Sequence, residues 1–132
     1  ACSLALFEGE GLVAHRHEIL GRGHAEHLVP MIANLPDKGR ADEIRVSLGP
    51  GSFTGVRIGL AAARALGLAW GAPVLGYPTL ALVAAQCSET GAVLPGSLEV
   101  RDPPDILICM AGGHGEWFVQ PFDAARDPAG PL

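Results

Sequence analysis

The stretch Ser47-Leu-Gly-Pro-Gly-Ser-Phe-Thr-Gly-Val-Arg-Ile-Gly-Leu-Ala61 decides the fold of this chain. It predicts the end of an apolar strand, a glycine-rich turn, and a helix that starts at Ser52 or Thr54. A turn of this kind directs backbone N–H groups at one point, and the helix N-terminus adds partial positive charge, which suits an anion. The residues expected to shape this loop near an anion or a nucleotide are Gly49, Gly51, Ser52, Thr54, Gly55 and Arg57.

This loop departs from the common enzyme signatures. A P-loop ends in Gly-Lys-Ser/Thr, whereas Gly55 is followed by Val56 and Arg57. A nucleophile elbow needs glycine two places before its serine, where this chain has Pro50, and the glycines are too widely spaced for a dinucleotide loop. We therefore interpret Ser52 as a turn and helix-cap residue, and we predict no catalytic residue.

The expected helix, Thr54 to Gly71, is apolar or small almost all round, which predicts burial on most of its sides. Each glycine inside a helix is destabilising by roughly 0.8–1 kcal/mol relative to alanine, so a row of small residues needs a compensating contact. Either a second helix approaches along the row, or the helix packs tightly on its own sheet. The row consists of Gly55, Gly59, Ala63, Gly67 and Gly71.

Composition limits the possible functions. With 132 residues, 48% of them hydrophobic and 17% charged, the chain is expected to fold into a packed globular domain. A net charge of −5 and 5% aromatic residues argue against direct nucleic-acid binding by the surface as a whole. The longest apolar stretch is broken by Arg64 and is too short to span a membrane. Three separated cysteines predict reduced core thiols in a cytoplasmic protein: Cys2, Cys87 and Cys109.

Apolar patterns predict further elements on both sides of the glycine-rich loop. Strands are expected at 3–7, 12–18, 43–48, 73–77, 106–110 and 116–122, and helices at 23–35 and 80–87. Pro30 lies inside the first helix, and Thr79 is expected to cap the last one. Residues 88–104 are rich in glycine and proline, which predicts a boundary between two lobes.

Histidines offer the one arrangement that suggests a metal. His24 and His27 are three residues apart on the first expected helix and could share a metal ion. No third ligand is evident in the sequence, so we predict no metal site. His15 and His17 share one face of a strand, which we interpret as solvated.

The run from Gly49 to Gly59 resembles the TsaB (YeaZ) family, subunits of the bacterial machinery that forms threonylcarbamoyladenosine in tRNA. The similarity extends through 62–69, 73–76 and 24–35, and to Gly115-Glu116 before an apolar strand. The chain has Ala111 where the family usually has Asp. It also spaces His24 and His27 as H-x-x-H, unlike the H-x-x-x-H of the catalytic subunit TsaD.

The resemblance implies an α/β protein with the actin-like, Hsp70-like ATPase (ASKHA) fold of two lobes. The first lobe would be nearly complete over residues 1–88, with a linker at 89–104 and a truncated second lobe beginning at 105–132. The family's opening strand would precede Ala1.

The resemblance also implies a non-catalytic scaffold that supports threonylcarbamoyl transfer by a TsaD-type partner. The expected partners are TsaD, a TsaE-type ATPase and a second copy of the chain, with tRNA contacted only indirectly and no membrane. No cofactor is expected to bind tightly, and ATP or ADP would bind at the partner interface. The expected dimer contact consists of His24, Leu28, Ile32, Gly59, Ala63 and Gly67.

Two enzymatic alternatives remain open from the sequence. One is a TsaD-like metal-dependent transferase or glycoprotease-type enzyme, which would bind metal at His24 and His27. The other is a sugar-kinase-like ATPase of the same fold, which would need a catalytic Asp that we do not identify.

Overall fold

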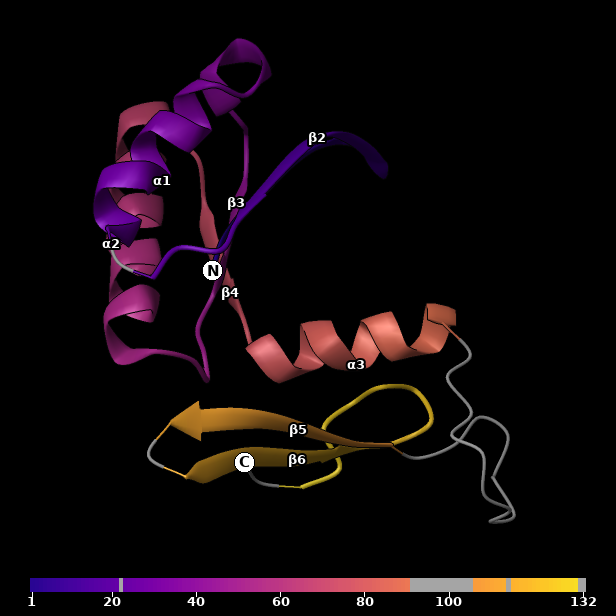
Figure 1. Cartoon of the computed structure of the whole chain (residues 1–132). Helices are drawn as coiled ribbons and strands as arrows, with labels where there is room; N and C mark the ends of the chain where they lie inside the picture. The colour runs from indigo at the N-terminus through magenta and orange to yellow at the C-terminus, as the bar shows by residue number, and fades with distance from the viewer. Residues whose placement is uncertain (22, 91–105, 114, 131–132) are drawn as a thin grey trace. The chain divides into compact units, whose positions relative to one another are not determined.

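The computed structural model describes residues 1–21, 23–90, 106–113 and 115–130 (Figure 1). Along the chain its elements are β1 (Cys2–Glu8), β2 (Gly11–Glu18), α1 (His24–Ala33), the 3-10 turn η1 (Pro36–Gly39), β3 (Ile44–Ser47), α2 (Phe53–Trp70), β4 (Val74–Tyr77), α3 (Thr79–Thr90), β5 (Ile106–Gly113) and β6 (Glu116–Phe122). Every strand and helix expected from the sequence is present, with ends shifted by a few residues. The predicted linker lies almost wholly outside the described residues.

The chain folds into two compact units, and neither is continuous in sequence. Unit 1 consists of Ala1–Val46 and Arg57–Leu75, and unit 2 of Ser47–Val56 and Gly76–Leu132. The chain therefore crosses between the units in β3, in the first turn of α2, and in β4.

Unit 1 opens with the antiparallel hairpin β1–β2. Cys2, Leu4 and Leu6 are partly buried, while the residues between them are exposed, which is the period of two expected of a strand with one packed face. In helix α1, Leu28 and Met31 are buried and lie three residues apart, on one side of the helix.

Strands β3 and β4 form a two-stranded sheet with α2 as their connection. The Ile44 N–H donates to the Pro73 carbonyl and the Leu48 N–H donates to the Tyr77 carbonyl, both at 2.9 Å. Because the offset between partners is the same at both ends, the strands are parallel, as in a β–α–β unit.

The core of unit 2 lies between α3 and the hairpin β5–β6 (Figure 1). Leu80 and Ala84 of α3 pack with Ile108 of β5 and Phe122 of β6, and all four are buried. Fully burying a leucine, isoleucine or phenylalanine side chain contributes about 1.5–3 kcal/mol, so this cluster stabilises the unit.

In the part of the chain that the structure describes, no helix is both long and apolar enough to cross a membrane.

Candidate functional site

The glycine-rich loop between β3 and α2 is anchored to the start of α3. The Thr79 N–H donates to the Gly49 carbonyl at 2.8 Å. The hydroxyls of Ser47 and Thr79 lie 2.6 Å apart in a part-buried hydrogen bond, and the Gly49 N–H donates to the Ser47 hydroxyl at 3.3 Å. Thr79 was expected only as a helix cap, and the structure uses both its N–H and its hydroxyl to hold the loop.

One glycine of this loop is needed for its path, and a second lies close to α2. Gly49 has a φ of 96°, in the region that side chains rarely adopt, and it precedes Pro50 through a cis peptide bond. A Cβ at Gly51 would lie 3.4 Å from Val56 Cγ2, so the backbone passes close to the first turn of α2. Gly49 thus gives the turn a backbone conformation that favours glycine, and the expectation that this loop lies near an anion or a nucleotide stays a prediction.

Ser52 caps α2. Its hydroxyl accepts the Gly55 N–H at 3.0 Å, and its carbonyl accepts the Val56 N–H at 3.0 Å. This is the geometry of an N-cap residue, and it satisfies a donor that the first turn leaves without a helical partner. A Cβ at Gly55 would lie 2.8 Å from the Ser52 hydroxyl, so the cap also requires a small residue there. The interpretation of Ser52 as a cap is confirmed, and Thr54 and Arg57 lie exposed beside it.

The small residues in the middle of α2 face strands of their own chain. Ala63 is 5% exposed, and a Cβ at Gly67 would lie 2.5 Å from Val74 Cγ2 of β4. A Cβ at Gly59 would lie 3.7 Å from Val46 Cγ2 of β3. The second sequence alternative, tight packing on the helix's own sheet, therefore accounts for this row. A dimer contact through the same residues stays a prediction.

The opposite face of α2 is exposed and partly apolar. Leu68 is 88% exposed, with Ala61, Arg64 and Ala65 exposed on the same side, and Phe53 at the N-terminus of the helix is 69% exposed. The sequence predicted burial on most sides of α2, and this prediction is wrong, because only Ala63 and Gly67 of the helix are buried and this face is exposed. The spacing of these residues, on the helix side opposite the row of small residues, was the signal that could have identified it.

The α1 residues of the expected contact differ in accessibility. Leu28 is buried, while His24 and Ile32 are partly buried. Ile32 faces η1, because a Cβ at Gly39 would lie 2.9 Å from Ile32 Cγ2. Only part of the expected α1 surface is therefore accessible in this chain.

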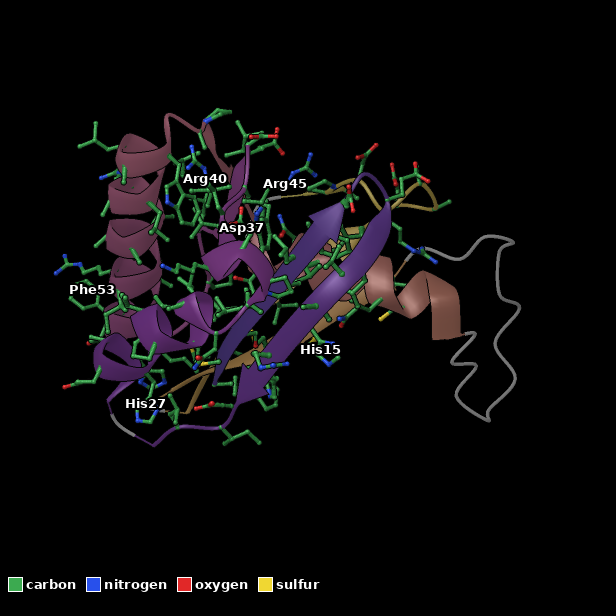
Figure 2. The ribbon with its side chains drawn as sticks, turned by 90° about the horizontal axis from the view of Figure 1, so that it is seen from above. His15, His27, Asp37, Arg40, Arg45 and Phe53 are labelled. Atoms are coloured by element: carbon green, nitrogen blue, oxygen red, sulfur yellow. The ribbon has the colours of Figure 1, made fainter. Side chains whose placement is uncertain are left out.

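The histidines of unit 1 lie on two elements, His15 and His17 on β2 and His24 and His27 on α1, and Figure 2 labels His15 and His27. His27 of α1 places Nδ1 3.4 Å from Glu18 Oε2, and His17 of β2 pairs through Nδ1 with the Ser3 hydroxyl at 2.8 Å. His15 is exposed, as expected of a solvated strand face. Among the described residues, no group of three His, Cys, Asp or Glu side chains is placed to hold a metal ion.

The cysteines correct one expectation. All three are free thiols, but Cys87 and Cys109 are exposed and are not core residues. Cys109 is exposed because alternation along β5 turns it away from the face that packs on α3. Cys2 is partly buried, and this burial, followed by the negative charge of Glu18, raises the pKa of its thiol.

Comparison with known proteins identifies the family. Residues 16–126 match the family described as TsaD, tRNA N6-adenosine threonylcarbamoyltransferase. The chain is 37% identical over 89 residues to the tRNA threonylcarbamoyladenosine biosynthesis protein TsaB of Escherichia coli K12, covering 64% of this chain and 38% of that protein. It is 39% identical over 97 residues to TsaB of Haemophilus influenzae, covering 67% of this chain and 39% of that protein.

Among solved structures, YeaZ from Pseudomonas aeruginosa superposes with a TM-score of 0.77 and 27% identity, over 98% of this chain and 60% of that one. The chain thus has a mixed α/β fold similar to that of YeaZ, and it spans about two fifths of the length of the curated relatives it matches. The chain therefore belongs to the tRNA N6-adenosine threonylcarbamoyltransferase (TsaD) family, and within it to the TsaB/YeaZ members.

Proposed function

We propose that this chain acts in tRNA threonylcarbamoyladenosine biosynthesis as a non-catalytic subunit that supports a TsaD-type catalytic partner. Its relatives in Escherichia coli and Haemophilus influenzae are named for that biosynthesis. We further infer an ASKHA fold in which residues 1–88 form a nearly complete first lobe and residues 105–132 begin the second.

The observation that carries the scaffold role is the division of α2 into two faces. One face is used inside the chain, where Gly67 packs against Val74. The other presents Leu68 at 88% exposure, and Phe53 at the N-terminal end of the helix is 69% exposed. A helix that packs on its own sheet through small residues and exposes large apolar ones on its outer side is suited to a partner helix. The charge of Arg64 on that side fits the polar rim of such a contact.

The predicted contact residues lie on two helices. Gly59, Ala63 and Gly67 are on α2, and His24, Leu28 and Ile32 are on α1. We propose that α2 and α1 together form the surface that pairs with TsaD or with a second copy of the chain. A TsaE-type ATPase would join the complex, tRNA would be contacted only through the partner, and ATP or ADP would bind at the partner interface near the glycine-rich loop.

The test is pairing measured by light scattering, with and without a TsaD-type partner. Leu68→Asp places a charge on the outer face of α2. Because burying a leucine contributes about 1.5–3 kcal/mol, its loss should weaken pairing about ten- to a hundredfold. Ile19→Asp is the matched control, since Ile19 is 86% exposed and lies outside α2. Equal pairing by both variants, or no pairing by the unaltered chain with either partner, would contradict the proposal.

The enzymatic alternative is favoured by one observation, the description of the matching family as a transferase. It requires metal at His24 and His27. Calorimetric titration of the isolated chain with Zn²⁺ separates the two functions. Stoichiometric binding that is lost in both His24→Ala and His27→Ala supports the enzyme. A chain that pairs with TsaD and takes up no Zn²⁺ supports the scaffold.

A further inference from the structure

The η1 turn, Pro36–Gly39, has an unusual backbone for the residues that form it (Figure 2, where Asp37 is labelled). Asp37 has φ 48° and ψ 34°, and Lys38 has φ 55° and ψ 28°. Gly39 follows with a φ of 71°, so three consecutive residues are left-handed. Residues with a side chain rarely adopt this backbone, and least of all in succession, because the Cβ is crowded against a carbonyl oxygen. The turn is therefore held in a conformation that Asp37 and Lys38 disfavour.

The contact with helix α1 holds the turn in this conformation. Gly39 is buried, and a Cβ there would lie 2.9 Å from Ile32 Cγ2 and 3.0 Å from the Ile32 carbonyl oxygen. The same Cβ would lie 3.4 Å from Leu35 Cδ1, and Leu35 is 8% exposed. Asp37 and Lys38 themselves are exposed. The apolar surface that η1 covers on α1 thus offsets the strain in the turn.

The apolar surface beneath η1 continues into exposed surface of α1. Val29 lies three residues before Ile32, on the same side of the helix, and it is 59% exposed. Ala25 and Ala33 are exposed on that side as well. Ile32 therefore lies at the edge of an exposed apolar strip, and η1 covers the end of this strip. Movement of η1 away from α1 would extend the strip by Ile32 and Leu35.

We propose that η1 is a strained cover over the α1 part of the pairing surface, and that it opens when α1 pairs with a partner. The inference rests on the proposed function, because it concerns the surface of α1 and α2 described there. A cover that is closed in most molecules reduces the apparent affinity for a partner in proportion to the open fraction. The left-handed residues keep this reduction small, because their strain is released on opening. Opening also explains how Ile32, a residue of the expected contact, reaches a partner.

Opening of η1 can be measured on the isolated chain, because Lys38 is its single lysine. Endoproteinase Lys-C cuts only after lysine, and a protease binds an extended backbone and not a tight turn. The rate of cleavage between Lys38 and Gly39 therefore reports the open fraction of the turn. Cleavage of the same chain unfolded in urea corrects for any change in the residues next to the cut bond.

Two substitutions should move η1 in opposite directions. Gly39→Ala adds a Cβ against Ile32, so it should speed Lys-C cleavage at least about fivefold and strengthen pairing by a similar factor, although it destabilises the folded chain. Asp37→Gly removes one source of strain, so it should slow cleavage and weaken pairing, each about two- to fivefold. Asp37→Asn keeps a side chain at the left-handed position and is the matched control, which should change neither.

Pairing is measured by light scattering, for the chain alone and with a TsaD-type partner. If η1 is only a structural turn, Gly39→Ala will weaken pairing or leave it unchanged, and Asp37→Gly will leave it unchanged. Either result overturns the inference while the proposed function stands. If the unaltered chain pairs with neither partner, the proposed function fails and this inference fails with it. Circular dichroism shows whether Gly39→Ala folds, and where it does not, Asp37→Gly against Asp37→Asn decides.

Discussion

Two glycines of α2 should respond in opposite ways to the same substitution. Replacing glycine with alanine inside a helix stabilises it by roughly 0.8–1 kcal/mol, provided the new methyl group has room. At Gly59 the added Cβ would lie 3.7 Å from Val46 Cγ2, an ordinary van der Waals contact. We therefore expect Gly59→Ala to raise the free energy of unfolding by up to about 1 kcal/mol.

At Gly67 the same methyl group has no room. It would lie 2.5 Å from Val74 Cγ2 and 3.0 Å from the Ala72 carbonyl, whereas carbon atoms pack best at about 3.5–4.0 Å. Overpacking of this kind is destabilising by about 1–3 kcal/mol, which outweighs the gain in helix propensity. Gly67→Ala should thus lower the free energy of unfolding by about 1 kcal/mol, leaving the two variants about 2 kcal/mol, or thirtyfold in the folding equilibrium, apart.

Urea denaturation followed by circular dichroism measures both variants against the unaltered chain. The two substitutions make the same chemical change in one helix, so the comparison isolates the contact with β4. If Gly67→Ala proves as stable as Gly59→Ala, then Gly67 is not held against Val74. The small-residue row would then be free for a helix partner, as the first sequence alternative had it.

Three further predictions concern the loop and the hairpin β1–β2. Ser52→Ala removes the α2 cap and should lower the free energy of unfolding by about 1 kcal/mol in urea denaturation, whereas Ser52→Asp should retain most of it; equal losses would contradict the capping role. Thr79→Val removes the hydroxyl bonded to Ser47 and should lower it by about 1–2 kcal/mol, with Thr79→Ser as the control that keeps the bond. Because the pKa of the Cys2 thiol is raised, this thiol should react with iodoacetamide more slowly than the two exposed cysteines at mildly alkaline pH, and Glu18→Gln should increase its reaction rate. The stability that the thiol contributes is present at low pH. It is lost as pH rises through the folded pKa, because the thiol ionises at lower pH in the unfolded chain.

Local patterns were sufficient to predict the secondary structure. The helix α2 follows from an apolar run that begins after a serine cap, and the hairpin β5–β6 from two short apolar runs around a glycine-rich turn. These signals act between residues that are close in sequence, so they can be read without a three-dimensional structure.

The contacts that join distant segments were not predictable in the same way. The hydroxyl bond between Ser47 and Thr79 links residues 32 positions apart and depends on the parallel pairing of β3 with β4. The side of α2 that packs on the sheet likewise depends on which strands lie beneath it. Burial of Cys109 was mispredicted because an apolar context in the sequence does not show which face of a strand is covered.

Because neither unit is continuous in sequence, the two units cannot be completed in the order in which their residues are synthesised. Unit 1 has all of its residues once Leu75 has been made. The glycine-rich loop is made earlier but belongs to unit 2, and its hydrogen bonds to Thr79 can form only after α3 begins to emerge. During translation the loop before α2 therefore lacks its hydrogen bonds to Thr79, while the rest of α2 can already pack in unit 1. A translational pause that leaves this loop outside the ribosome while Thr79 is still inside the exit tunnel would prolong the period in which the loop is accessible to chaperones or proteases.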